Sequence, residues 1–334
     1  MHFTTHTHCY RVVDGHSLNL TLYVPQGPGP HPAILDMHGG AWVHFDHRVD
    51  FYWCEQFARR GYVVASCDFR GGTEARWPAP YEDLQHALRW LTTEGLAYGV
   101  DPTRIATIGG STGGHLAMTL AMAPRGVGLE IDIPVHTVIA FYPIVDVLDR
   151  YRYVQDYLFT PATRQMARWL RRAADRGTQL QPVGIGSGGP APRLRRLAQL
   201  RSQHPTLGDL LGSAAHRSIT ALSRLDLPRA FLYPDLRAAH HATFESESQM
   251  QQASPSYIVA RNLQRHLPRI LAFVPLHDTN VRPGQAQVFA QNYRRSGGEI
   301  ELIELGDVGH GFGAIPSREV DACIDRADRL MRSH

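Results

Sequence analysis

Apolar and polar residues alternate along the chain with two periods, and the period changes at recognisable turn residues. From Tyr10 to Val24 the alternation has a period of two on both sides of Asp14-Gly15, which predicts an antiparallel hairpin. Short apolar runs typical of buried strands follow, separated by segments of helical periodicity such as 81–98. We expect further strands at 33–37, 62–68, 105–109, 135–142, 270–274 and 300–305. Further helices are expected at 48–60, 283–295 and 316–331, and one more helix should follow the strand at 105–109 and end at about residue 122. Strands that alternate with helices predict an α/β fold, with a mostly parallel central sheet covered by helices on both faces.

The pattern weakens in the middle of the chain. Residues 184–192 are rich in glycine, proline and serine, and arginines are dense between 164 and 201. We therefore predict a core domain at 1–148 and 251–334, interrupted by a largely helical cap insertion at 149–250. Insertions after strands of such a sheet fall at the edge where ligands bind, so the cap is expected to set substrate choice. A partly disordered excursion and a dimer contact are the alternatives. The apolar residues that could line a pocket under the cap are Trp169, Leu170, Leu194, Leu197, Leu200, Leu210 and Leu211.

Composition narrows the classes of function. The formal net charge of +3 is too small to favour a nucleic-acid partner, and the 34 basic residues, all arginine, are widely spread. The 4 cysteines are too far apart to predict a disulfide scaffold or a zinc ribbon. No signal peptide or membrane-spanning stretch is visible, so we expect a cytoplasmic protein without a membrane partner, and a homodimer stays open. The histidines near the start are expected in a frayed, polar terminus.

One stretch carries a chemical signature. The apolar run that begins at Ile105 leads into Gly109-Gly110-Ser111-Thr112-Gly113 and then into good helix formers. This order predicts a strand, a sharp turn and a helix, with Ser111 at the apex of a nucleophile elbow. Small residues on both sides let the strand and the helix pass closely, and the helix N-terminus favours negative charge beside the serine. A plain glycine-rich turn is the alternative.

A serine nucleophile needs a general base and an acid that orients the base. His310 lies between two glycines just after the last core strand, and Asp278 follows the strand that ends at Val274. The order Ser, Asp, His along the chain is the order found in α/β-hydrolases. Asp146 is the competing acid, because it also follows a core strand.

Acyl transfer also requires donors for an oxyanion. Gly39 and Gly40 follow a predicted strand, where glycine permits close approach of the backbone, and the N–H of Thr112 is the second source. Trp42 and Phe312 are candidate substrate contacts, although packing alone would also explain Trp42. His44, Asp46 and His47 have the chemistry of metal ligands but lack supporting partners, so neither a metal nor a cofactor is expected.

These motifs together resemble α/β-hydrolases of the carboxylesterase type, near the hormone-sensitive-lipase-like and the acetyl-esterase and feruloyl-esterase-like branches. The resemblance implies Ser111 as nucleophile, Asp278 as acid, His310 as base, and oxyanion donors at Gly39, Gly40 and Thr112. The chain departs from the family pattern at Ala41, where a third glycine is common, at Gly110 and Thr112, where Asp and Ala are common, and in its long insertion. The matching stretches are 38–42, 68–70, 81–91, 101–105, the elbow, 278–281 and 309–312.

The sequence therefore predicts a serine hydrolase that cleaves a small-molecule carboxylic ester through an acyl-enzyme. Three alternatives stay open. Two use the same triad: an amide or formamide hydrolase, similar to kynurenine formamidases, and a biosynthetic acyltransferase or cyclase. The third is a non-catalytic binding protein with a hydrolase fold, which the intact set of Ser111, Asp278 and His310 disfavours.

Overall fold

The structure is a computed structural model, which describes residues 2–129, 132–158, 236–333 and isolated positions between 196 and 214. Most of the predicted cap insertion, including Trp169, Leu170 and Leu194, lies outside the described residues. Of the other apolar residues predicted to line a pocket there, Leu210 and Leu211 are exposed.

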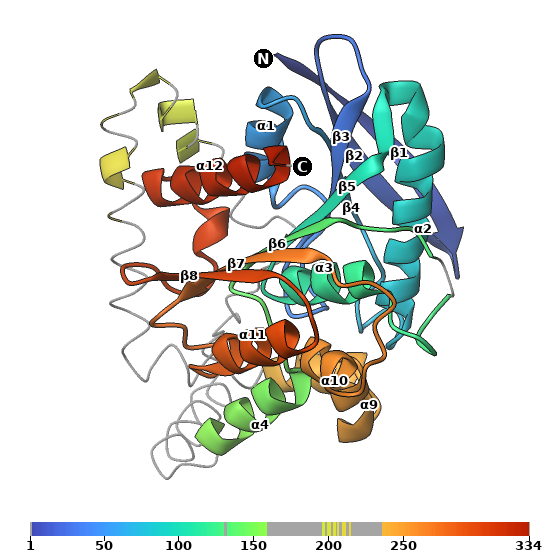
Figure 1. Cartoon of the computed structure of the whole chain (residues 1–334), viewed down its shortest axis with the longest axis vertical. Helices are drawn as coiled ribbons and strands as arrows, with labels where there is room; N and C mark the ends of the chain where they lie inside the picture. The colour runs from blue at the N-terminus through green and yellow to red at the C-terminus, as the bar shows by residue number, and fades with distance from the viewer. Residues whose placement is uncertain are drawn as a thin grey trace, which may run out of the picture.

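An eight-stranded sheet forms the centre of the molecule, in the order β1-β2-β4-β3-β5-β6-β7-β8 (Figure 1). β1 and β2 form the predicted hairpin, and β2 also pairs antiparallel with β4. From β4 to β8 all neighbours are parallel, so the carboxyl ends of these strands meet at one edge. The strands are β1 Phe3–Val13, β2 His16–Pro25, β3 His31–Met37, β4 Val63–Cys67, β5 Val100–Gly110, β6 Thr137–Phe141, β7 Arg269–Pro275 and β8 Ile300–Leu305.

Helices cover both faces of this sheet, as the alternating pattern predicts. α1 and α12 pack on one face, where Ile34, Ile108 and Phe273 point toward them. α2, α3, α10 and α11 cover the other face, and α3, α10 and α11 lie below the sheet in Figure 1, with α2 at its right. The helices are α1 Phe51–Arg59, α2 Ala79–Thr93, α3 Thr112–Met122, α4 Val147–Leu158, α9 Glu247–Gln252, α10 Pro255–Ala260, α11 Gln285–Arg295 and α12 Arg318–Arg332, with short 3-10 turns at Glu94–Tyr98 and Phe312–Ala314.

The expectation of a frayed N-terminus is wrong. β1 begins at Phe3, so His6 and His8 lie in a strand that pairs with β2, and the Tyr98 hydroxyl lies 2.8 Å from the His8 imidazole. These residues are polar on both faces because β1 is an edge strand with little core beneath it. Backbone pairing with β2, rather than side-chain burial, therefore determines this part of the strand.

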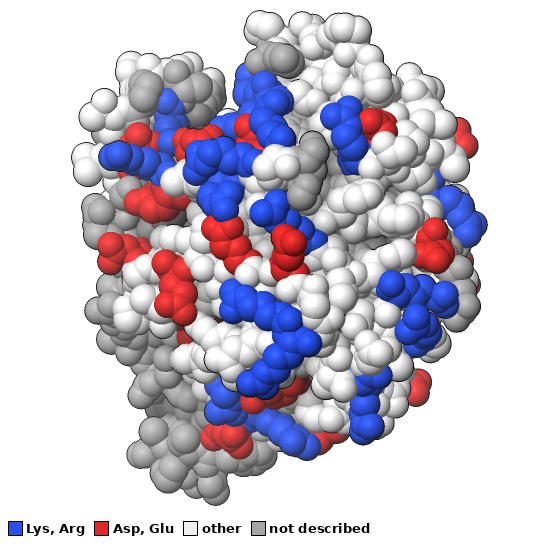
Figure 2. Space-filling view, in the orientation of Figure 1, with Lys and Arg blue, Asp and Glu red and all other residues white. Residues whose placement is uncertain are grey.

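Arginine and acidic side chains are interspersed over the face seen in Figure 2. Among the helices that the structure describes, none is long and apolar enough to cross a membrane.

Candidate active site

Ser111 lies at the turn between β5 and α3 in a strained backbone conformation, with φ 58° and ψ −118°. The turn is possible because its neighbours are small. A Cβ on Gly113 would lie 1.9 Å from the carbonyl oxygen of Met37 in β3, and a Cβ on Gly109 would lie 2.4 Å from the backbone of Gly113. The predicted elbow is therefore present, and Ser111 is 9% exposed at the carboxyl edge of the sheet.

The structure brings Ser111, His310 and Asp278 into one hydrogen-bonded chain. The Oγ of Ser111 is 2.8 Å from Nε2 of His310, and Nδ1 of His310 is 2.8 Å from Oδ2 of Asp278. The other carboxylate oxygen of Asp278 accepts the backbone N–H groups of Asn280 and Val281, at 2.8 and 3.0 Å. With both oxygens held, the carboxylate orients the imidazole so that its Nε2 faces the serine hydroxyl.

Asp146, the competing acid, forms hydrogen bonds at the start of α4 instead of contacting His310. Its Oδ1 accepts the backbone N–H of Asp149 at 2.9 Å, at the start of α4, and burial raises the pKa of its carboxyl. Its own backbone N–H and carbonyl bind the side chain of Gln285. The geometry therefore places Asp278, and not Asp146, against His310.

The loop after β3 lies beside the nucleophile. A Cβ on Gly39 would come within 3.0 Å of the Gly110 carbonyl and 3.6 Å of the Ser111 Cβ. Gly40 has φ 113°, and a Cβ there would lie 2.2 Å from the His44 carbonyl. The N–H groups of Gly39, Gly40 and Thr112 receive no acceptor from the residues that the structure describes. They therefore stay candidates for the oxyanion donors that the sequence predicts.

Ala41 and Trp42 continue this loop with φ of 55° and 62°, a conformation in which a side chain is strained. A third glycine at position 41 would relieve one of the two strains. The Thr112 hydroxyl is buried next to the nucleophile and has no hydrogen-bond partner in the described part of the chain. Of the departures from the family pattern, Gly110 and Thr112 thus flank Ser111 directly, whereas Ala41 packs against Val154, Leu236 and Ala239.

Trp42 and Phe312, the two candidate substrate contacts, are each 1% exposed. The indole N–H of Trp42 donates to Nδ1 of His115 at 3.2 Å, and Phe312 packs against Phe141 and Tyr142. Burial lowers the pKa of His115 to about 4, which keeps the ring neutral and able to accept this bond. Both aromatic side chains thus support the loops on which the site is built.

Arg150 on α4 is a site residue that the sequence did not single out. It is 1% exposed, its Nε donates to the carbonyl of Asn280 at 3.2 Å, and its Nη1 donates to Nε2 of His240 at 3.1 Å. Its guanidinium also lies 5.7 Å from the ring centre of Trp42. Burial, and then the positive charge of Arg150, lower the pKa of His240 well below its usual value, so this ring is a neutral acceptor. No sequence signal distinguishes Arg150 from its many arginine neighbours.

The two ends of the predicted insertion meet around Trp42. α4 supplies Arg150 and Tyr151, and the helical residues 236–243 supply His240 and His241, whose ring lies 3.0 Å from the Tyr151 hydroxyl. Trp42 packs edge-on against His240 and Phe244. The described ends of the insertion therefore rest on the loop that carries Gly39 and Gly40.

Two buried acids lie below this loop. Asp36 in β3 is 0% exposed and accepts hydrogen bonds from Nε1 of Trp53 at 2.9 Å and from Oγ of Ser66 at 2.5 Å. Burial raises the pKa of Asp36 to about 7. Burial, together with the charge of Asp36, also raises the pKa of Asp50, whose Oδ2 has no partner among the described residues. In the sequence, the position of Asp36 inside the apolar run 33–37 indicates a buried carboxyl group.

Asp46 and His47, which have the chemistry of metal ligands, contact other side chains near the site. Nδ1 of His47 lies 2.8 Å from Oδ1 of Asp68, and Asp68 also accepts the backbone N–H of Asn19. Asp46 pairs with Arg48, which lowers the pKa of its carboxyl to about 2. Among the residues described, no three His, Cys, Asp or Glu side chains are grouped as a metal site.

Comparison with known proteins finds esterases among the chains that are similar to this one. Residues 20–183 match the family model described as BD-FAE. The versiconal hemiacetal acetate esterase of Dothistroma septosporum is 34% identical over 111 residues, which are 33% of either chain. The ethyl acetate hydrolase of Pseudomonas putida is 32% identical over 220 residues, which are 63% of this chain and 60% of that protein. The aligned part therefore spans less than two thirds of either relative.

Solved structures show the same fold over nearly the whole chain. Esterase 2 of Thermogutta terrifontis, phosphoramylated by tabun, superposes with a TM-score of 0.63 at 18% identity and covers 98% of this chain and 94% of its own. Its native form superposes with the same TM-score of 0.63 at 20% identity.

Proposed function

We propose that the chain is a serine hydrolase of the α/β-hydrolase superfamily that cleaves carboxylic esters. The observation that carries the proposal is the hydrogen-bonded chain from Ser111 through His310 to Asp278, beside three backbone N–H groups without acceptors in the described residues. The likeness of the sequence to curated esterases supports an ester rather than another acyl compound.

The geometry supports the following first half-reaction. His310 takes the proton of Ser111 through Nε2 as Oγ attacks the carbonyl carbon of the ester, and the carbonyl oxygen becomes an anion. The N–H groups of Gly39, Gly40 and Thr112 stabilise that oxyanion, and the dipole of α3 adds to them. The tetrahedral intermediate then expels the alcohol, which leaves with the proton from His310, and an acyl-Ser111 ester remains.

The second half-reaction repeats these steps with water. His310 takes a proton from the water molecule, the hydroxide attacks the acyl carbon, and Ser111 leaves with the proton held by the imidazole. Asp278 keeps the imidazole oriented and stabilises its charged form in both halves. Because its Oδ1 is held by two backbone N–H groups, the carboxylate does not need to move between the steps.

Fluorophosphonate labelling and ester turnover test this proposal together. Ser111→Ala should abolish both, with a loss of turnover of several powers of ten, whereas Ser17→Ala, which changes an exposed serine in β2, should leave both unchanged. Mass spectrometry should find the label on Ser111. A label on a different serine, or full turnover by the Ser111→Ala variant, would contradict the proposal.

Aryl esters of graded chain length identify the acyl group. Two relatives are named for acetate esters, so acetyl esters are the first substrates to test. A formylated aromatic amine belongs in the same panel, because the same triad would also serve a formamide hydrolase. Turnover of the formamide that exceeds turnover of every ester would replace the ester by an amide as the substrate class.

We also propose that residues 149–250 form a cap that selects the substrate. The described ends of this segment support the proposal, since Arg150 and His240 contact each other beside Trp42 in the loop next to Ser111. Replacement of residues 160–245 by a short linker should preserve labelling of Ser111 and remove the preference between bulky and small esters. An unchanged preference in the folded, shortened protein would exclude the cap from substrate choice.

A further inference from the structure

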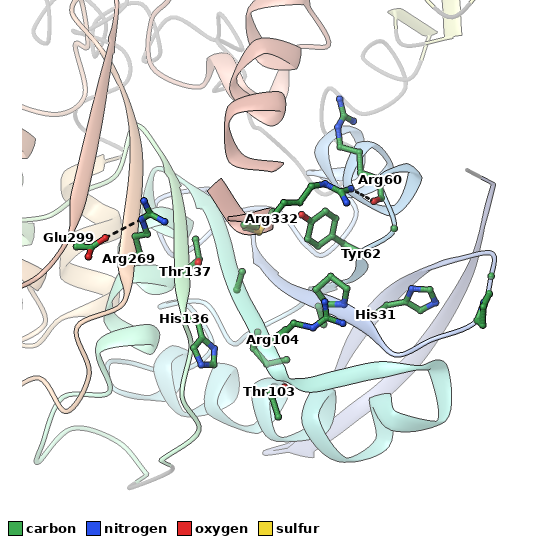
Figure 3. A pocket seen from close by; sticks show the side chains of 18 of the residues that line it. His31, Arg60, Tyr62, Thr103, Arg104, His136, Thr137, Arg269, Glu299 and Arg332 are labelled. Carbon is green, nitrogen blue, oxygen red and sulfur yellow. Dashed lines mark hydrogen bonds and ion pairs between the residues drawn. The ribbon is translucent and has the colours of Figure 1, made fainter. Parts of the chain in front are cut away.

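A cavity of about 880 Å³, which Figure 3 shows from close by, is lined by residues of four strands of the sheet. Its lining includes residues near the amino ends of β3, β6 and β7 and from the middle of β5, among them Ala33, Thr137, Arg269 and Ile105. Ile105 lies six residues before Ser111 along β5, a separation of roughly 20 Å in an extended strand. The cavity is therefore separate from the site described above.

The lining combines an apolar surface with basic groups. The apolar lining residues that are at least partly exposed are Pro28, Pro32, Leu267 and Met331. Glu299, which pairs with Arg269, is the carboxylate among the described lining residues. The basic side chains around the cavity are those of His31, Arg60, Arg104, His136, Arg269 and Arg332.

Two of these arginines are held in place by partners on neighbouring segments. Nε of Arg104 donates to Asp101 at 2.6 Å and its Nη2 donates to the carbonyl of Pro30 at 3.1 Å. Nε of Arg332 donates to Asp328 at 2.9 Å and its Nη2 donates to the carbonyl of Arg60 at 2.7 Å, a contact drawn in Figure 3.

The third nitrogen of each of these two guanidinium groups still has N–H donors available for a ligand. Nη1 of Arg104 and Nη1 of Arg332 have no acceptor among the described residues, and the two side chains are 50% and 58% exposed. An arginine carries five N–H donors, so a guanidinium that is already paired with one carboxylate can still bind another anion. The existing contacts fix the position of each group and reduce the entropy lost when such an anion binds.

We propose that this cavity is a binding site for a small organic carboxylate with an apolar, ring-sized body. The volume lies within the range of small-molecule sites, which enclose an apolar body and orient it through a few polar groups. The apolar side chains of Pro28, Pro32, Leu267 and Met331 contact the body, and Arg104 and Arg332 donate hydrogen bonds to the carboxylate. Binding at this site does not depend on the proposed ester hydrolysis and leaves Ser111 accessible.

Titration calorimetry with naphthalene-2-carboxylate, and with naphthalene-2-carboxamide as its neutral analogue, tests both parts of the proposal. The carboxylate should bind at one site per chain and at least about tenfold more tightly than the carboxamide, because charge-assisted hydrogen bonds to arginine distinguish the two. Equal affinities, or no binding of the carboxylate up to millimolar concentration, would overturn the proposal.

Variants then locate the site. Arg104→Gln and Arg332→Gln each keep a polar, flexible side chain and should each weaken carboxylate binding about tenfold, with no effect on ester turnover. The matched control is Arg326→Gln, which changes an arginine of the same helix as Arg332 that pairs with Glu301 and does not line the cavity. All three positions are partly exposed, so the variants should fold, and thermal melting verifies this. Unchanged affinity in both cavity variants would place the carboxylate elsewhere and overturn the assignment.

Discussion

Replacement of Asp36 by asparagine should change how the stability of the protein depends on pH. Asp36 is fully buried below the loop that carries Gly39, and burial raises the pKa of its carboxyl from 3.8 to about 7. In the unfolded chain the same carboxyl loses its proton near pH 4. Between these two values the folded state holds a proton that the unfolded state has lost, so the free energy of unfolding falls as the pH rises.

The magnitude follows from the size of the shift. A difference of roughly 3 pH units between the folded and unfolded pKa corresponds to about 4 kcal/mol, lost progressively from about pH 4 to pH 7 and constant above that. The asparagine side chain cannot ionise, yet its amide oxygen can still accept the hydrogen bond from Trp53. The Asp36→Asn variant should therefore lose this pH dependence and gain stability relative to the wild type as the pH rises.

Urea unfolding of both proteins at pH 5 and pH 8, followed by circular dichroism, measures the effect. The variant should become more stable relative to the wild type by about 3 kcal/mol between the two pH values. Asp50→Asn is the companion variant, because the carboxyl of Asp50 is buried too and its pKa is raised partly by the charge of Asp36. An identical pH dependence in the wild type and the Asp36→Asn variant would refute the reasoning.

Three further predictions concern the site and its support. Asp278→Asn should lower ester turnover, measured by steady-state kinetics, by a factor on the order of 10³ to 10⁴, whereas Asp146→Asn should change it less than about twofold. The reverse ranking would assign the role of the acid to Asp146. Arg150→Met should cost about 2 kcal/mol of unfolding free energy in urea, because it leaves a buried histidine acceptor without its donor, and Arg150→Lys should recover part of that loss; a Met variant as stable as the wild type would contradict this role. Gly113→Ala should lower the free energy of unfolding by about 3 kcal/mol or more and remove fluorophosphonate labelling, because its Cβ would lie 1.9 Å from a carbonyl oxygen of β3. The control variant Gly306→Ala, where nothing lies within 4 Å of the added Cβ, should unfold at the same temperature as the wild type and be labelled to the same extent.

Local features of the sequence were enough to predict the elements and the elbow. The period-two alternation predicted the hairpin around Asp14-Gly15, and the apolar runs predicted each parallel strand to within about two residues, except that β5 begins at Val100, five residues before the expected start. Gly109 and Gly113 predicted the sharp turn at Ser111, because only a residue without a Cβ fits between β3, β5 and α3. These features depend on neighbours within a few residues, so a single sequence contains them.

The partners of the catalytic groups depend on contacts between distant segments. Asp146 and Asp278 both follow core strands, and only the packing shows that Asp278 reaches His310 while Asp146 binds the start of α4. The same holds for Arg150, which resembles many other arginines in the sequence until α4 places it beside Trp42.

The basic cavity could not be predicted at all. Arg104, Arg269 and Arg332 come from β5, β7 and α12, and the order of strands in the sheet brings their ends together. The sequence by itself therefore determined the local backbone, the fold class and the residue types of the site, because backbone sterics and burial periodicity act over short range. The tertiary structure alone decided which side chains meet, because strand order, register and helix packing bring together residues that are separated by tens to hundreds of positions in the chain.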